Sequence, residues 1–245
     1  MSALMAVFIW VLLKTNSSIK SIQNQGFMDS IHPITLPSEV SQANKMQGYY
    51  RFHAKIYDLT RWTFLFGRQW LIDWLPYRRN DSPLIMEVGC GTGYNLKHLS
   101  SQLPKAKLMG LDVSASMLDI ADKKLFDIPN LFVLRQKTYG AETINFFKKP
   151  DCILFSYCLT MVNPNWEDLV LQAKNDLDED GIVAIVDFHQ SKFTWFRNWM
   201  QFNHVRMDGH ILPFLTQHFE TVKIERRRAY FGLWHYFLFI GKIRQ

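Results

Sequence analysis

The sequence lacks the features of a secreted or fibrous protein. Its 245 residues include only 3 cysteines, 9 prolines and 12 glycines. The cysteines are odd in number and lie within apolar runs, which is typical of a reducing compartment rather than of a disulfide framework. The low glycine and proline content excludes a collagen-like chain. With 48% hydrophobic and 15% aromatic residues, the sequence predicts a globular, cytoplasmic protein with a sizeable core.

The sequence also lacks a hydrophobic run of membrane-spanning length near its start. The apolar run at residues 3–13 contains eleven uncharged residues, whereas a spanning helix needs roughly 20. A secretory signal carries positive charge ahead of its apolar stretch, but here Lys14 follows the run. Neither a transmembrane helix nor a secretory signal is therefore predicted.

The residues that follow this run are polar. Residues 15–45 are rich in Ser, Asn, Gln and Pro and are predicted to form a linker. We therefore expect an arm of residues 1–45 and one folded domain of residues 46–245. Two interpretations of the arm stay open: a membrane-contacting anchor, or dispensable sequence ahead of a true start at Met28 or Met46.

The excess of positive charge is modest. Lys and Arg number 28 against 22 Asp and Glu, which gives a net charge of +6 and a pI near 9.2. An excess this dilute does not by itself predict nucleic-acid binding, and it suits an anionic membrane surface equally well. We expect no nucleic-acid partner.

From residue 84 onward, short apolar runs alternate with helical patterns. Continuous apolar strands that alternate with helices predict a parallel sheet covered on both faces. The last two strands are expected to form an antiparallel pair. The predicted strands are 84–88, 107–111, 131–134, 152–155, 181–186, 221–226 and 230–241. The predicted helices are 94–103, 115–124, 166–177 and 192–203, and Ser114 is the predicted N-cap of the second of these.

A glycine loop follows the first predicted strand. Residues 87–93 read EVGCGTG, a spacing that differs from both the dinucleotide-binding and the phosphate-binding glycine motifs. Glycines let the backbone approach a ligand closely, and Glu87 offers a carboxylate to a cationic amine. Asp112, at the end of the second strand, can accept hydrogen bonds from ribose hydroxyls. The ligand inferred is a nucleoside that carries an amino-acid cation.

The motifs LIMEVGCGTGYN and LMGLDVSASML resemble those of class I S-adenosylmethionine-dependent methyltransferases over residues 84 to about 187. The resemblance implies an α/β, Rossmann-like fold with a seven-stranded, mostly parallel sheet, helices on both faces and an antiparallel last strand. It implies S-adenosylmethionine as cofactor and no metal. The predicted cofactor-binding residues in this range are Glu87, Gly89, Gly91, Gly93, Asp112, Val113, Met117, Thr138 and Ser156. Two more, Tyr57 and Arg61, lie upstream of it, and Arg61 suits a carboxylate of either the cofactor or the substrate.

One departure from the family pattern concerns the adenine. The family often has an acidic residue just after the third strand, and here none occurs before Glu142. Backbone near Lys137 and Thr138 is the expected replacement.

A narrower resemblance extends over residues 49–241. The segments YYRFHAKIYDLTRWTFLFGRQWLI, FSYCLTMVNPNWEDLV and WFRNWMQFNHVRMDGHIL resemble the N-methyltransferases that make the betaine lipid diacylglyceryl-trimethylhomoserine. The resemblance implies three successive methyl transfers to the amine of diacylglyceryl-homoserine, a lipid met at the inner membrane surface by a peripheral enzyme. It also implies an upstream lipid synthase that transfers homoserine.

This chemistry indicates which side chains to expect near the methyl group. The attacking amine must be neutral, and the later intermediates are cations that aromatic faces stabilise. Tyr157, just after the fourth strand, and Tyr50 are the predicted catalytic residues. For each, a core tyrosine with its hydroxyl bound to backbone is an open alternative.

Polar residues near the same edge are the predicted substrate contacts. His53 and His204 are candidate bases or partners of a tyrosine. Asp187, after the fifth strand, is expected either to hold the substrate amine or to cap the next element. Arg206 and the arginines at 226–228 would attract anionic headgroups.

The aromatic helix at 192–203 is expected either to lie at a membrane interface or to pack its rings into the core.

Other functions of the protein stay open. The nearest are N-methylation of phosphatidylethanolamine and C-methylation of a quinone, and a protein of another class would be a cofactor-binding regulatory subunit without catalysis.

Overall fold

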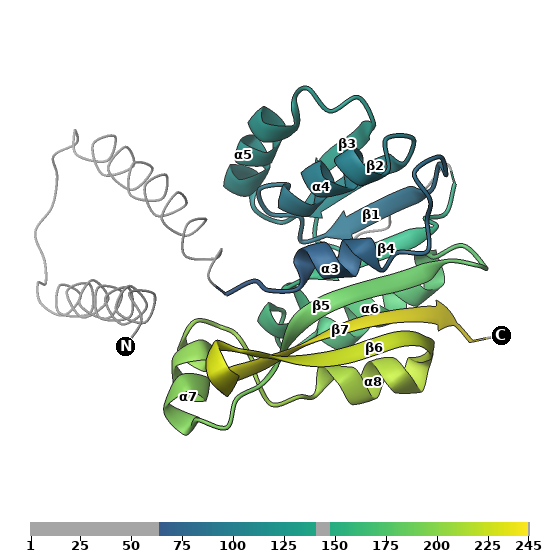
Figure 1. Ribbon diagram of the computed structural model, residues 1–245. Coiled ribbons are helices and arrows are strands. Elements are labelled where there is room, and N and C mark those ends of the chain that lie inside the picture. The colour runs from purple at the N-terminus through teal and green to yellow at the C-terminus, as the bar shows by residue number, and fades with distance from the viewer. Residues whose placement is uncertain (1–63, 141–147, 245) are drawn as a thin grey trace, which may run out of the picture. The chain divides into compact units, whose positions relative to one another are not determined.

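The protein's structure is a computed structural model that describes residues 64–140 and 148–244 (Figure 1). The predicted arm and its boundary at Met46 lie outside the described residues, and so does Glu142. Four predicted site residues also lie outside them: Tyr50, His53, Tyr57 and Arg61.

Seven strands form one sheet in the order β3-β2-β1-β4-β5-β7-β6. The first five pair in parallel, and β7 is antiparallel to both of its neighbours. This arrangement confirms the predicted fold class and the antiparallel final pair. The strands are β1 (Leu84–Val88), β2 (Lys107–Asp112), β3 (Leu131–Gln136), β4 (Cys152–Ser156), β5 (Ile182–Gln190), β6 (Phe219–Ala229) and β7 (Trp234–Ile243).

The central strands are buried along their length. Every residue of β1 and β4 is buried, and only the last residue of β5 is exposed. This is the burial expected for parallel strands with helices on both faces. The edge strand β3 is an exception to the predicted burial, because it has one neighbour and leaves Phe132 66% exposed.

Helices cover both faces of the sheet (Figure 1). On one face lie α3, α4 and α5, which contact one another in sequence. On the other face, α6 and α8 contribute Val170 and Leu215 to a core that includes Met86, Val183 and Phe237. The helices are α3 (Arg68–Asp73), α4 (Tyr94–Gln102), α5 (Ala115–Leu125), α6 (Trp166–Asp176), α7 (Thr194–Phe202) and α8 (Ile211–His218), with short 3-10 turns η1 (Leu159–Met161) and η2 (Tyr230–Gly232).

Two of the observed helices, α3 and α8, are absent from the predicted set. The segment of α8 is short and contains Pro213, and proline usually argues against a helix. Here Pro213 lies in the first turn, where the missing N–H would have had no partner within the helix. The helix forms because Ile211, Leu212 and Leu215 are buried against the sheet.

The glycine that ends the loop after β1 is required by its packing. Gly93 lies just before α4 with φ 73°, and a Cβ placed there would come within 2.6 Å of Leu125 Cδ1 on α5. Both the backbone conformation and the close approach of the two helices exclude a side chain.

We therefore expect Gly93→Ala to lower the free energy of unfolding by about 2–4 kcal/mol, because it adds overpacking to backbone strain. Gly232 is the matched control, since it has φ 96° but no atom within 4 Å of the added Cβ. Gly232→Ala should cost only about 1 kcal/mol. Denaturant unfolding measures both, and equal losses would contradict the proposed packing role.

Candidate functional site

The glycine loop lies at the carboxyl end of β1 in a tightly held conformation. Gly89, Gly91 and Gly93 have φ values of 72°, 52° and 73°, in the left-handed region that favours glycine. The N–H groups of Gly89 and Cys90 both donate to the Leu111 carbonyl, at 2.8 and 2.9 Å. The loop is thus fixed against the end of β2.

The carboxylate of Asp112 joins this loop to the next one. One oxygen, Oδ2, accepts a hydrogen bond from the Gly91 N–H at 2.7 Å, and Oδ1 accepts one from the Ser114 N–H at 2.9 Å. Ser114 in turn caps α5, because its Oγ accepts from the Met117 N–H at 3.4 Å. This confirms the predicted cap and shows that Asp112 organises both loops. A carboxylate oxygen has a second lone pair for a ribose hydroxyl.

A second polar pair lies beneath the loop. Glu87 is buried on β1, and its Oε1 accepts a hydrogen bond from Asn95 Nδ2 at 2.6 Å. The other amide atom, Asn95 Oδ1, is buried and has no hydrogen-bond partner within the described residues. Sequence reasoning missed Asn95, although its place in the first turn of the helix after the glycine loop was a usable signal.

The residues expected around the adenine lie at the ends of β2 and β3. Val113 is 63% exposed although it is apolar, Met117 is half-buried, and Thr138 is exposed. Gln136 Nε2 donates to the Val113 carbonyl at 3.1 Å and joins the two strand ends. The N–H of Lys137 already donates to the Asp112 carbonyl at 3.0 Å. Of the two backbone positions expected to contact the adenine, this leaves Thr138 as the better candidate.

These features fit the cofactor that the resemblance implies. An ammonium group would supply donors to the buried acceptor Asn95 Oδ1 beside Glu87. A ribose would meet the Asp112 carboxylate, and an adenine ring would cover the exposed side chain of Val113. An acceptor buried without a donor is costly unless a ligand satisfies it.

Tyr157 lies just past the end of β4 in a strained conformation with φ 54°. Its hydroxyl donates to the Phe66 carbonyl at 2.7 Å, and its ring packs edge-on against Phe188 with centroids 4.6 Å apart. Burial, with the charge of Asp187, raises the Tyr157 pKa well above its usual value. Tyr157 therefore keeps its proton. Its hydroxyl is bound to a backbone carbonyl, as in the alternative of a core tyrosine that the sequence left open.

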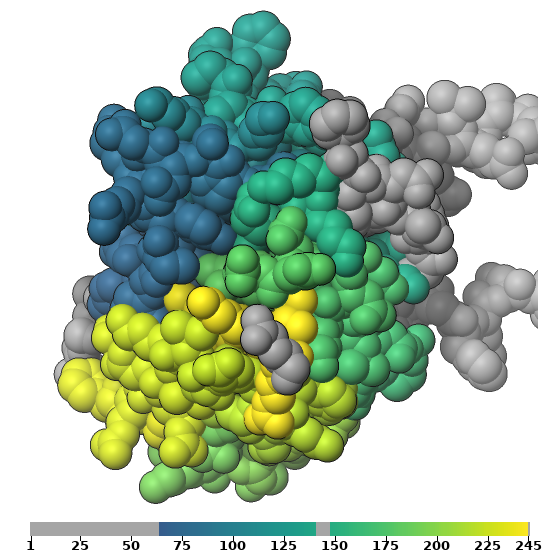
Figure 2. Space-filling model, turned by 90° about the vertical axis from the view of Figure 1, so that its right-hand side faces the viewer, coloured from purple at the N-terminus to yellow at the C-terminus, as the bar shows by residue number. Residues whose placement is uncertain are grey.

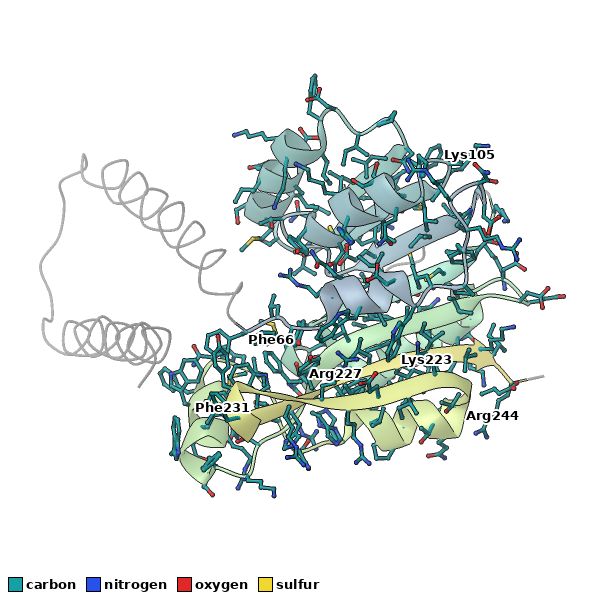
Figure 3. All side chains as sticks on the ribbon, in the orientation of Figure 1. Phe66, Lys105, Lys223, Arg227, Phe231 and Arg244 are labelled. Carbon is teal, nitrogen blue, oxygen red and sulfur yellow. The ribbon has the colours of Figure 1, made fainter. Side chains whose placement is uncertain are left out.

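Aromatic rings continue from Tyr157 toward the β6–β7 turn. Phe66 lies 5.5, 6.1 and 6.2 Å, between ring centroids, from Tyr230, Trp234 and Tyr236. We call these four residues, together with Tyr157, the aromatic cluster. Figure 3 labels Phe66 between the carboxyl ends of the strands and the hairpin. Sequence reasoning did not identify the cluster, because its members come from three separate segments.

Asp187, on β5, binds the turn after β4, a structural role that was not predicted, and its contact with a substrate amine stays a prediction. It is fully buried, and its carboxylate accepts hydrogen bonds from Thr160 Oγ1 at 2.5 Å, the Thr160 N–H at 3.2 Å and the Phe188 N–H at 2.8 Å. Burial raises its pKa to about 6, while these bonds oppose the rise. Rather than capping the element after β5, Asp187 holds the turn after β4. Ser156, at the end of β4, is also buried.

The remaining predicted substrate residues lie in the connection between α7 and α8. His204 is exposed in a turn with φ 62°, and Arg206 is exposed and pairs with Asp208 at 2.7 Å. Neither residue is brought to the glycine loop. A histidine that sequence reasoning missed, His189 on β5, is 93% buried, and its Nδ1 has no hydrogen-bond partner in the described part of the chain.

Figure 2 shows the opposite edge of the sheet, which lies on the right in Figure 1. A charged depression lies there at the amino end of β5, lined by Glu179, Asp180, Glu220, Lys242, Ile243 and Arg244. Among the described residues, no group of His, Cys, Asp or Glu is placed to hold a metal ion. In the same ranges no helix is both long and apolar enough to cross a bilayer.

Comparison with known proteins gives a family match over most of the chain. A family model described as a methyltransferase domain matches residues 61–240. A malonyl-[acyl-carrier protein] O-methyltransferase of Bacillus anthracis is 28% identical over 117 residues, which are 48% of this chain and 42% of that protein. An uncharacterized protein of Rickettsia prowazekii is 24% identical over 55% of this chain and 52% of its own length. The chain thus spans about half or less of these relatives.

Solved structures share the fold at low identity. A 1,6-didemethyltoxoflavin-N1-methyltransferase of Burkholderia thailandensis, solved with S-adenosylhomocysteine, has a TM-score of 0.62 at 13% identity, over 88% of this chain and 94% of that one. The N-methyltransferase NodS of Bradyrhizobium japonicum has a TM-score of 0.59 at 12% identity, over 73% and 96% of the two chains. At such identities, the likeness extends to the fold alone.

Loss of the Thr160 hydroxyl should destabilise the protein in a pH-dependent way. Thr160→Val removes a donor to a buried carboxylate, so we expect a loss of about 1–3 kcal/mol in unfolding free energy at about pH 8. The lost donor raises the folded-state pKa of Asp187 further. The destabilisation is therefore full above that pKa and fades as the pH falls through it and the carboxyl takes up a proton.

Denaturant unfolding at about pH 8 and about pH 5 tests this dependence. Thr160→Ser keeps the hydroxyl and should restore most of the stability. The same loss at both pH values would show that the hydroxyl does not act through the charge of Asp187.

Asp112→Ala should weaken binding of S-adenosylmethionine by about tenfold to a hundredfold, because it removes both the anchor of the two loops and the acceptor for ribose. Titration calorimetry of the purified chain measures the affinity. Asp122→Ala makes the same charge change at an exposed position on α5 and should bind as the wild type does. Unchanged affinity in Asp112→Ala would exclude the assigned role.

Proposed function

The chain belongs to the methyltransferase domain family, and from this premise we propose that it transfers methyl groups to the amine of diacylglyceryl-homoserine. It is an S-adenosylmethionine-dependent methyltransferase, and the proposal concerns the acceptor. Three successive transfers would give the trimethylated betaine lipid. The resemblance of residues 49–241 to enzymes of that reaction is the first support.

The aromatic cluster is the observation that carries the proposal. It lies at the carboxyl ends of β4 and β5, next to the strands that hold the glycine loop. The rings of Tyr230, Trp234 and Tyr236 surround Phe66, whose carbonyl accepts the hydrogen bond from Tyr157. Methylated amines are cations, and each aromatic face stabilises a cation by roughly 0.5–2 kcal/mol. A carboxylate acceptor would instead pair with a positive charge, and Arg68 and Arg227 are close enough to act on the pKa of Tyr157 and of Tyr236. The choice of acceptor therefore requires a direct test.

The residues of this chain would contribute chiefly by positioning. Bound S-adenosylmethionine supplies an activated methyl group, and Asp112 and Asn95 would fix its two ends. Alignment of amine and methyl then accounts for most of the rate, because it converts a bimolecular reaction into one between fixed partners.

Tyr157 would orient the amine rather than deprotonate it. Its own proton is donated to the Phe66 carbonyl, which leaves the hydroxyl oxygen free to accept a hydrogen bond from the amine N–H. Because its pKa is raised, the phenol does not become a base at neutral pH. The amine must lose its proton through desolvation or to water.

The direct test supplies the purified full chain with labelled S-adenosylmethionine and detergent-dispersed diacylglyceryl-homoserine. We expect mono-, di- and trimethylated lipid by mass spectrometry. Phosphatidylethanolamine, a quinone precursor and malonyl carrier protein are the competing acceptors. Methylation of one of these without methylation of the homoserine lipid would refute the proposal, and cofactor binding without any turnover would favour a regulatory subunit.

Tyr157→Phe should lower the rate of the lipid reaction by about tenfold or more, because it keeps the ring and removes the orienting hydroxyl. Tyr77→Phe is the matched control, since Tyr77 also donates to a backbone carbonyl, that of Asp151 at 2.8 Å, but at the opposite edge of the sheet. Its activity should match the wild type. Equal rates in the two variants would remove Tyr157 from the mechanism.

A further inference from the structure

Large aromatic side chains are exposed on α7 and on the adjacent turn of the β6–β7 hairpin. Phe193, Trp195 and Phe202 are 45%, 54% and 56% exposed, and Phe231 at the turn is completely exposed. We call these four residues the α7–hairpin surface. Figure 3 shows Phe231 at the tip of the hairpin beside α7.

The surface has a rigid base. Phe196, on the inner side of α7, is fully buried and stacks on Trp234 with centroids 5.5 Å apart and an angle of 12° between the rings. This contact joins the helix to the hairpin. Phe231 has φ 57°, a conformation that a bulky residue adopts only at an energetic cost.

The charge of the whole protein is concentrated around this surface. Residues 188–207 and 226–237 contain six Lys or Arg residues and no Asp or Glu. Without these six, the chain has 22 basic residues, equal to its 22 acidic ones. The net charge of +6 is therefore the charge of these two segments. Two of the six basic residues already pair with acidic residues just outside these segments, Arg206 with Asp208 and Arg227 with Glu225. The other four would face an anionic partner, and they are Lys192, Arg197, Arg226 and Arg228.

The surface lies at the same edge of the sheet as the glycine loop. Because β7 is antiparallel to β5, the turn before β7 lies at the carboxyl end of β5. In Figure 1 this turn and α7 lie on the left, toward which β1 points. A flat partner bound there would face the side of the molecule on which the methyl acceptor is expected.

We propose that the α7–hairpin surface binds the surface of an anionic phospholipid bilayer. The aromatic rings would enter the interfacial region, and the surrounding cations would bind headgroup phosphates. Tryptophan and phenylalanine on a short helix flanked by basic residues are typical of such contacts. The inference deepens the proposed function by naming the place where the lipid would enter. Only this role in lipid entry rests on the proposed function, and the membrane contact itself does not.

Exposure of an aromatic ring alone does not lead to the same inference elsewhere. Phe126, after α5, is 84% exposed, but it is followed by Asp127 and preceded by a helix of mixed charge. It has no stretch free of acidic residues around it. Phe126 is therefore the matched control for an exposed ring outside the proposed surface.

The experiment is co-sedimentation of the purified full chain with vesicles. We expect binding to vesicles of phosphatidylglycerol mixed with phosphatidylcholine, weaker binding to phosphatidylcholine alone, and a decrease with added salt. Combining Trp195→Ser with Phe231→Asn, a residue that tolerates positive φ, should reduce vesicle binding by about tenfold or more. Phe126→Ser should bind as the wild type does.

A second pair of variants tests the charges without changing the aromatic rings. Arg226→Gln with Arg228→Gln should abolish the preference for phosphatidylglycerol, because both side chains are exposed on β6. Lys105→Gln with Lys123→Gln removes the same charge elsewhere, and Figure 3 shows Lys105 far from the hairpin. This control pair should keep the preference.

Several outcomes would overturn the inference. They are wild-type binding that ignores lipid charge, aromatic variants that bind as tightly as the wild type, or capture of a protein by this surface without vesicle binding. Activity on detergent-dispersed lipid separates this inference from the proposed function. We expect the aromatic variant to keep that activity and lose vesicle binding, whereas failure of the proposed function would remove activity and leave vesicle binding intact.

Discussion

The carboxylate of Asp112 is the interaction on which the geometry of the cofactor site depends. Parallel strands end at one edge of a sheet without a hydrogen-bonded turn between them, so something else must fix the loops that follow. Asp112 does this by accepting the N–H groups of Gly91 and Ser114 with its two oxygens. The glycine loop, the cap of α5 and the expected ribose site are therefore set by one side chain.

A second carboxylate fixes the turn after β4 in a similar way. Asp187, within β5, binds the turn after β4 through Thr160, and the Tyr157 N–H donates to the Val186 carbonyl at 2.8 Å. These bonds hold Tyr157 in its strained conformation. Burial of the charge makes Asp187 unfavourable in isolation, and its three hydrogen bonds offset that cost. Both loop systems are thus held by hydrogen bonds within the protein.

The sequence predicted the parts of this structure that are encoded locally. Continuous apolar runs identified β1, β4 and β5, and the cap at Ser114 identified the start of α5. The helix α8 escaped prediction because its stability comes from burial against the sheet rather than from propensity. The aromatic cluster and the partner of Asp187 were not predicted. Phe66, Tyr157 and Tyr236 meet only because β4, β5 and β7 are neighbours in the sheet, and no local sequence pattern shows this.

The antiparallel hairpin β6–β7 places aromatic residues in two different environments. A purely parallel sheet would end each strand in a crossover, whereas reversal at β7 brings a tight turn back to the carboxyl edge. The inner rings of that turn, Tyr230 and Trp234, pack against Phe66, while Phe231 points outward. One short segment therefore contributes to a buried aromatic cluster and to an exposed, positively flanked surface. Trp234 joins the two, because its ring contacts Phe66 of the cluster and Phe196 on the inner side of α7.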